Sequence, residues 1–175
     1  CRTRRAGGGF GGSPAAQLAL LRLAGRAGCH WVDGEAESLE SFPTRLRSAM
    51  LRGLRCIASF HDFRRTPASL APLYHHLVNL GGALVKIAVT ARRQGDNLAV
   101  LRLAQRHRGK VIALAMGNAG IPSRVLGLRA GSALTFASLN GGLATAAGLW
   151  PLSQLRDLYR AHRLNSRTRV YGVIG

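Results

Sequence analysis

Short apolar runs alternate with longer, more polar stretches along the chain. The apolar runs are nearly continuous in Val, Ile, Leu and Ala, as is typical of parallel strands that are covered on both faces. We expect strands over residues 29–32, 56–60, 84–89, 111–116 and 133–137. A length of 175 residues fits one domain with a real core.

The stretches between these runs carry apolar residues at helical spacing, as Leu152, Leu155, Leu158 and Tyr159 do. We expect helices over residues 14–27, 44–54, 67–80, 96–106, 123–128 and 152–163. A regular order of strand and then helix predicts βα units and an α/β fold with a parallel sheet.

Two arrangements fit such units: an open doubly wound sheet and a (β/α)8 barrel. The glycine-rich segment GGGFGG at 7–12 follows no complete strand, so it is a weak nucleotide-binding fingerprint. Polar residues cluster within or after several runs, and a barrel would gather such residues at one mouth. They are Asp33, Glu35, His61, Asp62, Lys86, Asn118 and Arg124. We therefore expect a (β/α)8 barrel that lacks its first two βα units.

The charge balance is extreme, with 25 Lys plus Arg, seven Asp plus Glu and a net charge of +18. Such a balance is typical of proteins that bind nucleic acid. The arginines are scattered through helical segments, however, and only 6% of residues are aromatic, which is poor for base stacking. We expect no specific nucleic-acid partner, and a basic RNA-binding protein stays an alternative. No apolar run approaches the ~18 residues of a membrane span, so no membrane partner is expected.

The three cysteines are widely spaced and form no CxxC pair. This pattern argues against a disulfide framework or a zinc site and predicts a reducing, cytoplasmic setting. Cys29 and Cys56 begin apolar runs, so we expect both to be buried packing residues.

Lys86 lies inside an apolar run, although only Lys86 and Lys110 among the 25 cations are lysines. Strand alternation puts Leu84, Lys86 and Ala88 on one face. A desolvated lysine amine can attack a carbonyl, whereas arginine stays protonated. The alternative is that Lys86 is buried as the ion-pair partner of a carboxylate such as Asp33 or Glu35. These two carboxylates could instead act as acid/base groups. The bias toward arginine favours chemistry, since an ion pair could have used arginine.

His61 ends a predicted strand and shares a face with Ile57 and Ser59. A histidine at the carboxyl end of a strand is a candidate general acid/base. The alternative is a histidine satisfied by a backbone or carboxylate partner. Asp62 could orient His61 or cap the turn, and Arg124 could hold a substrate carboxylate in a bidentate pair.

Four segments in order resemble type I 3-dehydroquinate dehydratase across about residues 1–165. They are FHDFRRTP at 60–67, LVKIAV at 84–89, MGNAGIPSRVLG at 116–127 and GSALTF at 131–136. The resemblance implies a (β/α)8 fold and a step of the shikimate pathway. It implies that Lys86 forms an imine with the C3 ketone of 3-dehydroquinate and that His61 moves the C2 proton. It implies no metal or cofactor beyond that imine.

The resemblance also implies that Arg2 and Arg124 bind the substrate, and that Thr145 keeps a hydroxyl in the lid loop. Ala6 stands where the family has a glutamate that positions the histidine, and Leu149 stands where it has a glutamine. The family's first two strands, which carry a Glu and an Arg of the site, are absent, so we expect impaired turnover. A degenerate, non-catalytic scaffold and another Schiff-base barrel such as a class I aldolase stay as alternatives.

The end of the chain, NSRTRVYGVIG at 165–175, resembles the junction of a bifunctional enzyme. We expect a partial dehydratase barrel over residues 1–165, then a linker and the first strand of a shikimate dehydrogenase domain over 166–175. Fusion to such a domain is implied, and NADP would be bound only where that domain is present. A homo-oligomer is compatible with the resemblance.

Overall fold

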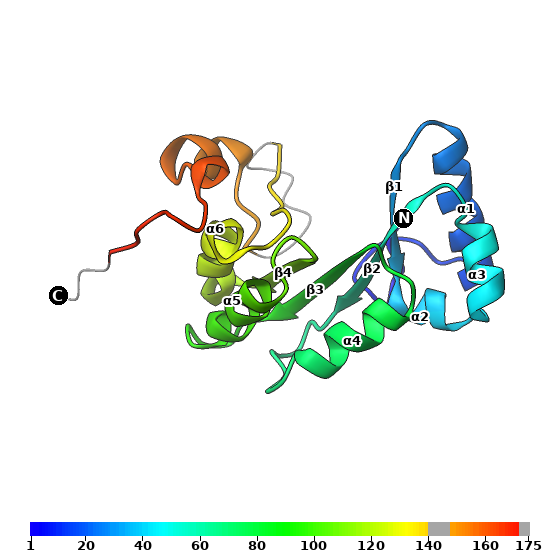
Figure 1. Ribbon diagram of the computed structural model, residues 1–175, viewed down its shortest axis with the longest axis horizontal. Coiled ribbons are helices and arrows are strands. Elements are labelled where there is room, and N and C mark those ends of the chain that lie inside the picture. Colours follow the sequence, from blue (N-terminus) through cyan, green and yellow to red (C-terminus); the bar gives the residue numbers. More distant parts are fainter. Residues whose placement is uncertain (140–147, 172–175) are drawn as a thin grey trace. The chain divides into compact units, whose positions relative to one another are not determined.

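The computed structural model describes residues 1–139 and 148–171. The chain divides into two compact units, Cys1–Val89 and Thr90–Gly175. Both units are built from strands and helices that alternate along the chain, which confirms the α/β class (Figure 1).

The first unit is built on three parallel strands, β1 (Trp31–Glu35), β2 (Arg55–His61) and β3 (Leu84–Thr90). β2 pairs with both of its neighbours, with Val32 beside Cys56 and Ala58 beside Val85. The predictions for β2 and β3 are correct to within one residue at each end. β1 begins two residues later than predicted, because Gly28 with φ +98° turns the chain after a helix and delays the strand.

Four helices accompany these strands: α1 (Pro14–Arg26), α2 (Ala36–Glu40), α3 (Thr44–Met50) and α4 (Ala71–Asn79). The start of α1 is fixed locally, because Ser13 Oγ accepts a hydrogen bond from the N–H of Ala16 at 3.2 Å and Pro14 takes the first helical position. The short helix α2 was not predicted, because its five residues are too few to establish a helical period.

One face of the strands packs against the helices. Val85, Ile87 and Val89 are almost fully buried on this face of β3. On β1, a side chain at Gly34 would meet Leu39 of α2 at 3.1 Å, so α2 packs directly on the strand backbone there. The face of β3 that carries Val85, Ile87 and Val89 is therefore the core side of the sheet in the first unit.

The second unit is centred on β4 (Val111–Met116), whose six residues are all buried. Helices α5 (Asp96–Arg106) and α6 (Ile121–Ala130) pack against this strand. Gly131 takes the left-handed conformation that ends α6, with φ +116°. The predictions for β4 and α5 are exact, and α6 extends two residues beyond its predicted range at both ends.

Two predicted elements of the second unit are wrong. Residues 133–137 form no strand in the described structure, because the Ser132 hydroxyl accepts from the N–H of Ala113 and donates to the carbonyl of Leu134, which bends the chain. The helix expected over 152–163 is broken. A π-helical turn over Gln154–Leu158 and a 3-10 turn over Ala161–Arg163 are separated by Arg160, whose φ is +49°.

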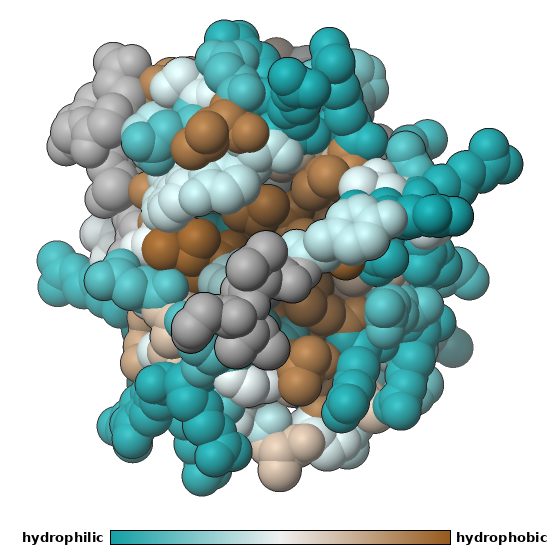
Figure 2. Space-filling view, turned by 90° about the vertical axis from the view of Figure 1, so that its left-hand side faces the viewer, coloured by the Kyte–Doolittle hydropathy of each residue, from teal (hydrophilic) through white to brown (hydrophobic). Residues whose placement is uncertain are grey.

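The surface mixes charged and apolar side chains. Figure 2 shows one face on which hydrophobic side chains gather near the centre and hydrophilic ones surround them. The three cysteine thiols are free. Cys56 is buried as predicted, whereas Cys29 is exposed, because the strand that it was expected to begin starts only at Trp31. In the described part of the chain, no helix is long and apolar enough to cross a membrane.

Candidate active site

The face of the first unit's sheet opposite the helix-packed face carries the polar residues. The parallel register aligns side chains of neighbouring strands in rows, because partner residues point to the same side. The rows are Asp33–Ile57–Leu84, Glu35–Ser59–Lys86 and His61–Ala88. The strand alternation predicted for Lys86 and His61 is confirmed, and both residues lie on one face of adjacent strands.

Lys86 is buried in this face, with 8% of the residue exposed. Its Nζ donates a hydrogen bond to Asp33 Oδ2 at 2.8 Å and forms an ion pair with that carboxylate. Asp33 lies one row nearer the amino ends of the strands, so the lysine side chain leans back across β2 to reach it. Of the two carboxylates that the sequence offered as partners, the structure selects Asp33.

Glu35 is held by the segment that precedes α1. Its carboxylate accepts hydrogen bonds from the backbone N–H of Thr3, at 3.0 Å, and from the Thr3 hydroxyl. Glu35 is buried. These two bonds tie the chain next to Arg2 to the end of β1, although the residues are 32 positions apart in sequence.

The segment from Arg2 to Phe10 closes on itself through its backbone. The N–H of Phe10 donates to the carbonyl of Arg2 at 3.0 Å, and the N–H of Gly8 donates to the carbonyl of Thr3 at 2.8 Å. A side chain at position 8 would lie 2.1 Å from the Arg2 carbonyl oxygen, so only glycine fits this loop. The loop thereby fixes the backbone of Arg2 beside the polar face.

His61 lies in an environment that disfavours its charged form. Burial is the main cause that lowers its pKa to about 4, and the positive charges of Lys86 and Arg2 lower it further. The Asp33 carboxylate acts in the opposite direction and is outweighed. The imidazole is therefore neutral at pH 7, which is the form that can accept a proton.

The Nδ1 atom of His61 is buried and has no hydrogen-bond partner among the described residues. The ring is instead stacked on Phe63, with 6.0 Å between ring centroids and 9° between planes. Phe63 in turn lies against Gly7, where an added side chain would be 2.7 Å from the ring. The imidazole is therefore held on this side by apolar packing against Phe63.

Asp62 caps the turn that follows β2. Its Oδ1 accepts hydrogen bonds from the N–H groups of Arg64 and Arg65 at 2.8 and 3.0 Å. Its own N–H donates to the carbonyl of Ala88, which extends the pairing of β2 with β3 by one bond. Of the two roles considered for Asp62, turn capping is the one that these contacts favour.

The remaining predicted site residues belong to the second unit. Arg124 lies in α6 and is buried, and this burial lowers the pKa of its guanidinium below the usual value. Thr145 lies outside the described residues. Leu149 is described and is half-buried. Within the first unit, the structure brings together Lys86 and His61 with Arg2.

Sequence reasoning missed Thr3 and Phe63. Thr3 is an ordinary residue in a basic segment, and nothing local indicates that it binds Glu35. Phe63 follows His61 by two positions, which is the one signal that could have placed both rings on the same side of the chain. Taken together, a buried amine and a neutral imidazole on one strand face can form an imine with a ketone and move a proton beside it.

Comparison with known proteins gives a consistent result. The family model described as type I 3-dehydroquinase matches residues 1–166. The 3-dehydroquinate dehydratase of Dehalococcoides mccartyi is 35% identical over 173 residues, which cover 96% of this chain and 76% of the relative. The chloroplastic bifunctional 3-dehydroquinate dehydratase/shikimate dehydrogenase of Arabidopsis thaliana is 30% identical, over 99% of this chain and 29% of the relative.

Solved structures show the same likeness. The crystal structure of 3-dehydroquinate dehydratase from Geobacillus kaustophilus matches with a TM-score of 0.77 and 25% identity, over 96% of this chain and 67% of that one. The enzyme from Aquifex aeolicus matches with a TM-score of 0.74, also at 25% identity, over 93% of this chain and 72% of that one. The fold of the chain is similar to both.

Proposed function

Since the chain belongs to the type I 3-dehydroquinase family, we propose that Lys86 and His61 carry the reaction of that family in it. The chain is a 3-dehydroquinate dehydratase, a hydro-lyase of the shikimate pathway. One observation supports the assignment of these two residues. Lys86 and His61 share one face of the sheet, where the Lys86 amine is buried and the His61 imidazole is neutral at pH 7.

The reaction begins with attack of the Lys86 amine on the C3 ketone of 3-dehydroquinate. Water leaves and an imine links C3 to Nζ. The imine draws electrons from C2, and His61 removes the C2 proton. The electron pair then expels the hydroxyl, to which His61 returns the proton, so a second water departs. Hydrolysis of the imine consumes one water, frees Lys86 and releases 3-dehydroshikimate, for a net loss of one water.

Asp33 has a defined part in the first step. An amine can attack a carbonyl only after it has lost its extra proton, and Asp33 Oδ2 lies 2.8 Å from Nζ. We assign Asp33 as the group that receives this proton and that holds Nζ in place over the strand face. Lys86 is then first the charged partner of Asp33 in an ion pair and, after it has given its proton to Asp33, the neutral nucleophile.

The other site residues would hold the substrate. Arg2 is fixed by its loop beside His61 and can bind the substrate through charge-assisted hydrogen bonds. Arg124 and Thr145 are assigned to the substrate carboxylate and to the lid on the strength of the sequence resemblance. Ala6 and Leu149 each remove a polar side chain that the resemblance leads us to expect, and we propose that turnover is slowed for this reason.

At the scale of the chain, we propose that residues 1–165 form part of a (β/α)8 barrel. The parallel strands β1 to β3, each followed by a helix, and the likeness to dehydratase structures support this arrangement. We propose that residues 166–175 form the linker to a shikimate dehydrogenase domain, as in the Arabidopsis thaliana relative that is named as bifunctional. The free cysteine thiols support a reducing compartment.

Borohydride trapping tests the imine directly. The protein is incubated with 3-dehydroquinate and reduced, and the modified peptide is located by mass spectrometry. We expect one adduct on Lys86, and we expect no adduct and no turnover in Lys86→Arg, because a guanidinium stays protonated and forms no imine. The matched control is Lys110→Arg, which removes the other lysine of the chain at an exposed position and should leave trapping and turnover unchanged. Turnover by Lys86→Arg at the wild-type rate would overturn the proposal.

A further inference from the structure

Glu35 is a buried carboxylate that the imine mechanism does not use. Only 5% of the residue is exposed, and it lies in the same row of the sheet as Ser59 and Lys86. Lys86 pairs with Asp33, however, and no cation forms an ion pair with Glu35 among the residues that the structure describes. Because burial of a carboxylate costs free energy unless hydrogen bonds replace its water, the contacts of Glu35 need a reason.

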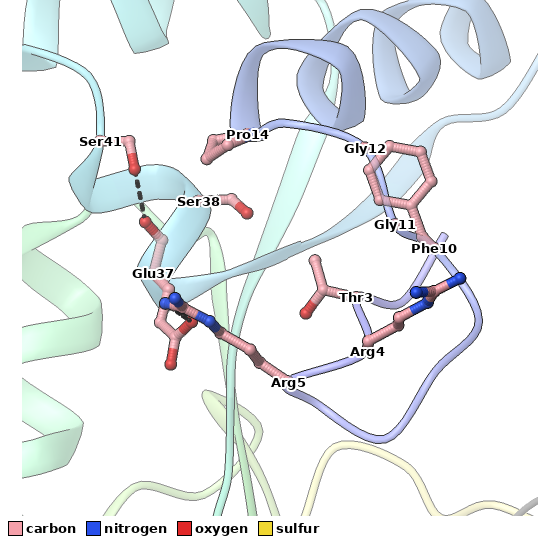
Figure 3. Close-up of a pocket in the computed structure, with 10 residues that line it drawn as sticks. All are labelled: Thr3, Arg4, Arg5, Phe10, Gly11, Gly12, Pro14, Glu37, Ser38 and Ser41. Carbon is pink, nitrogen blue, oxygen red and sulfur yellow. Dashed lines mark hydrogen bonds and ion pairs between the residues drawn. The ribbon is translucent and has the colours of Figure 1, made fainter.

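Both oxygens of this carboxylate contact one residue, Thr3. Glu35 Oε1 accepts from the backbone N–H of Thr3 at 3.0 Å, and Oε2 accepts from the Thr3 hydroxyl. Glu35 also stands at the amino end of α2, but its side chain makes no capping hydrogen bond there. Figure 3 shows the Thr3 side chain directed toward α2 and the Arg4 side chain directed away from it. The carboxylate thus holds the loop and not its own helix.

Arg2 is the residue whose place these bonds decide. It is half-buried, and its guanidinium makes no hydrogen bond or ion pair with any residue that the structure describes. Its position therefore depends on its backbone, which is held on both sides. Gln17 of α1 donates from Nε2 to the carbonyl of Cys1 at 2.8 Å, and Glu35 holds Thr3. Of these two anchors, only Glu35 lies on a strand of the sheet.

The same loop reaches His61 through an aromatic ring. A side chain added at Gly7 would lie 2.7 Å from the ring of Phe63, so the loop lies directly against this ring. Phe63 in turn stacks on the imidazole of His61. A displacement of the loop would therefore alter the surroundings of His61 as well as the place of Arg2.

We propose that Glu35 is a positioning residue for the dehydratase reaction. Through Thr3 it keeps Arg2 beside His61, where Arg2 can bind the substrate. This role rests on the proposed function, in which Arg2 is a substrate-binding residue. A glutamate suits the task better than a glutamine, because Thr3 presents two donors and glutamine offers one acceptor oxygen in place of two.

His61 can report the place of Arg2 without any turnover. Burial lowers the pKa of His61 most, the charges of Lys86 and Arg2 lower it further, and Asp33 acts in the opposite direction. If Arg2 moves away from the imidazole, one of the two positive charges acts less strongly. The pKa of His61 should then rise above its value of about 4.

Proton NMR titration without substrate tests the contact, with the His61 signals identified by their loss in His61→Gln. Thr3→Val removes the hydroxyl bond to Glu35 and leaves every charge in place, so the pKa of His61 should rise. Thr3→Ser keeps the hydroxyl and should not raise it. In an Arg2→Gln background, Thr3→Val should have no further effect, because Thr3 acts through Arg2. Equal rises with and without Arg2 would overturn the proposal.

Steady-state kinetics at pH 7 tests the effect on the substrate. Thr3→Val and Glu35→Gln should each raise KM for 3-dehydroquinate about tenfold and change kcat less than about twofold. The physical reason is that a displaced Arg2 binds the substrate less well, whereas Lys86 and His61 keep their places on the strands. Thr3→Ser should restore the wild-type KM.

The matched controls are Ser41→Ala and Glu37→Gln. They remove an exposed hydroxyl bond and an exposed carboxylate at α2, whose bonds are drawn in Figure 3. Both should leave KM and the pKa of His61 unchanged. If Glu37→Gln raises KM as much as Glu35→Gln, the effect comes from lost negative charge and Glu35 has no positioning role.

Failure of the positioning role and failure of the proposed function give different results. A wild-type KM in both Thr3→Val and Glu35→Gln, with turnover intact, would overturn the role of Glu35 alone. A wild-type chain without dehydratase turnover would contradict the proposed function, and the NMR titration would still decide whether Glu35 places Arg2. Thr3 is half-buried, so its variants stay informative even if Glu35→Gln folds poorly.

Discussion

His61 combines burial with two nearby positive charges, and this combination decides when it can act as a base. Its pKa is lowered to about 4 from an ordinary value of 6.5. Between pH 4 and 6.5, the unfolded chain binds a proton at this residue and the folded chain does not. His61 therefore makes the folded state less stable as the pH falls through this range, by at most about 3 kcal/mol.

We predict that kcat/KM falls on the acid side only at unusually low pH. A base with a pKa of about 4 stays active well below neutrality, so kcat/KM should be flat from pH 7 to about pH 5 and fall to half near pH 4. Steady-state kinetics with 3-dehydroquinate over pH 3.5–8 measures this directly. A half-point near pH 6.5 would mean that the surroundings of His61 do not perturb it in the working enzyme.

Ala6 provides a second test at this scale. The family resemblance leads us to expect a glutamate here, and His61 Nδ1 has no partner among the described residues. We predict that Ala6→Glu raises kcat about tenfold by hydrogen-bonding the imidazole, and moves the acid limb to higher pH because a carboxylate favours the charged histidine.

The matched variant is Ala6→Gln. It can hydrogen-bond His61 without adding charge, so we expect part of the gain in kcat and a smaller movement of the acid limb. If Ala6→Glu changes neither kcat nor the acid limb, the unpartnered Nδ1 has no bearing on catalysis, and packing against Phe63 is sufficient to hold the ring.

At the scale of elements, Asn97 joins three segments of the second unit. It is 4% exposed. Its Nδ2 donates to the carbonyls of Gln94 and Ala119, and its Oδ1 accepts from the N–H of Ser123 at the start of α6. One side chain thus fixes the amino end of α5 against the amino end of α6.

We predict that Asn97→Ala lowers the free energy of unfolding by about 3 kcal/mol, because it removes three hydrogen bonds and leaves the buried N–H of Ser123 without its partner. Urea denaturation followed by circular dichroism measures the change. Leu98→Ala, at the next position and 52% exposed, should cost less than about 0.5 kcal/mol. Equal losses in the two variants would show that the three hydrogen bonds contribute little.

The sequence predicted the elements whose pattern is local. The continuous apolar runs of β2, β3 and β4 are unambiguous, and the same alternation placed Lys86 and His61 on one face. Contacts between positions far apart in the sequence could not be predicted. Examples are the hydrogen bonds from Thr3 to Glu35 and the pairing of Lys86 with Asp33 in place of Glu35. The apolar run at 133–137 wrongly predicts a strand, because the contacts of the Ser132 hydroxyl with Ala113 and Leu134 are not visible in the pattern of the run.

For the molecule as a whole, the net charge of +18 is spread over structural as well as surface arginines. Arg47 is 5% exposed and donates to the carbonyls of Leu39 and Phe42, so this arginine supports the packing of α3 and is not free to bind a polyanion. Its planar fork suits that task better than a lysine would.

We predict that nucleic acid binds this chain only by non-specific electrostatic attraction to its phosphates. Affinity for duplex DNA should fall at least 100-fold between 50 and 200 mM salt, and sequences of equal length should differ less than about twofold. Fluorescence anisotropy with two unrelated duplexes measures both quantities. A preference of more than tenfold that persists at 200 mM salt would favour the RNA- or DNA-binding alternative.

The two lysines differ in a way that chemistry can report. Lys110 is exposed and Lys86 is buried. An acylating reagent added to the folded chain should therefore label Lys110 first, and Lys86 only after denaturation. A protease that cleaves after lysine divides the denatured chain at 86 and 110, and a reduced imine on Lys86 blocks the first cut. The fragment 1–110 in a peptide map is thus a direct record of how many molecules have formed the covalent intermediate.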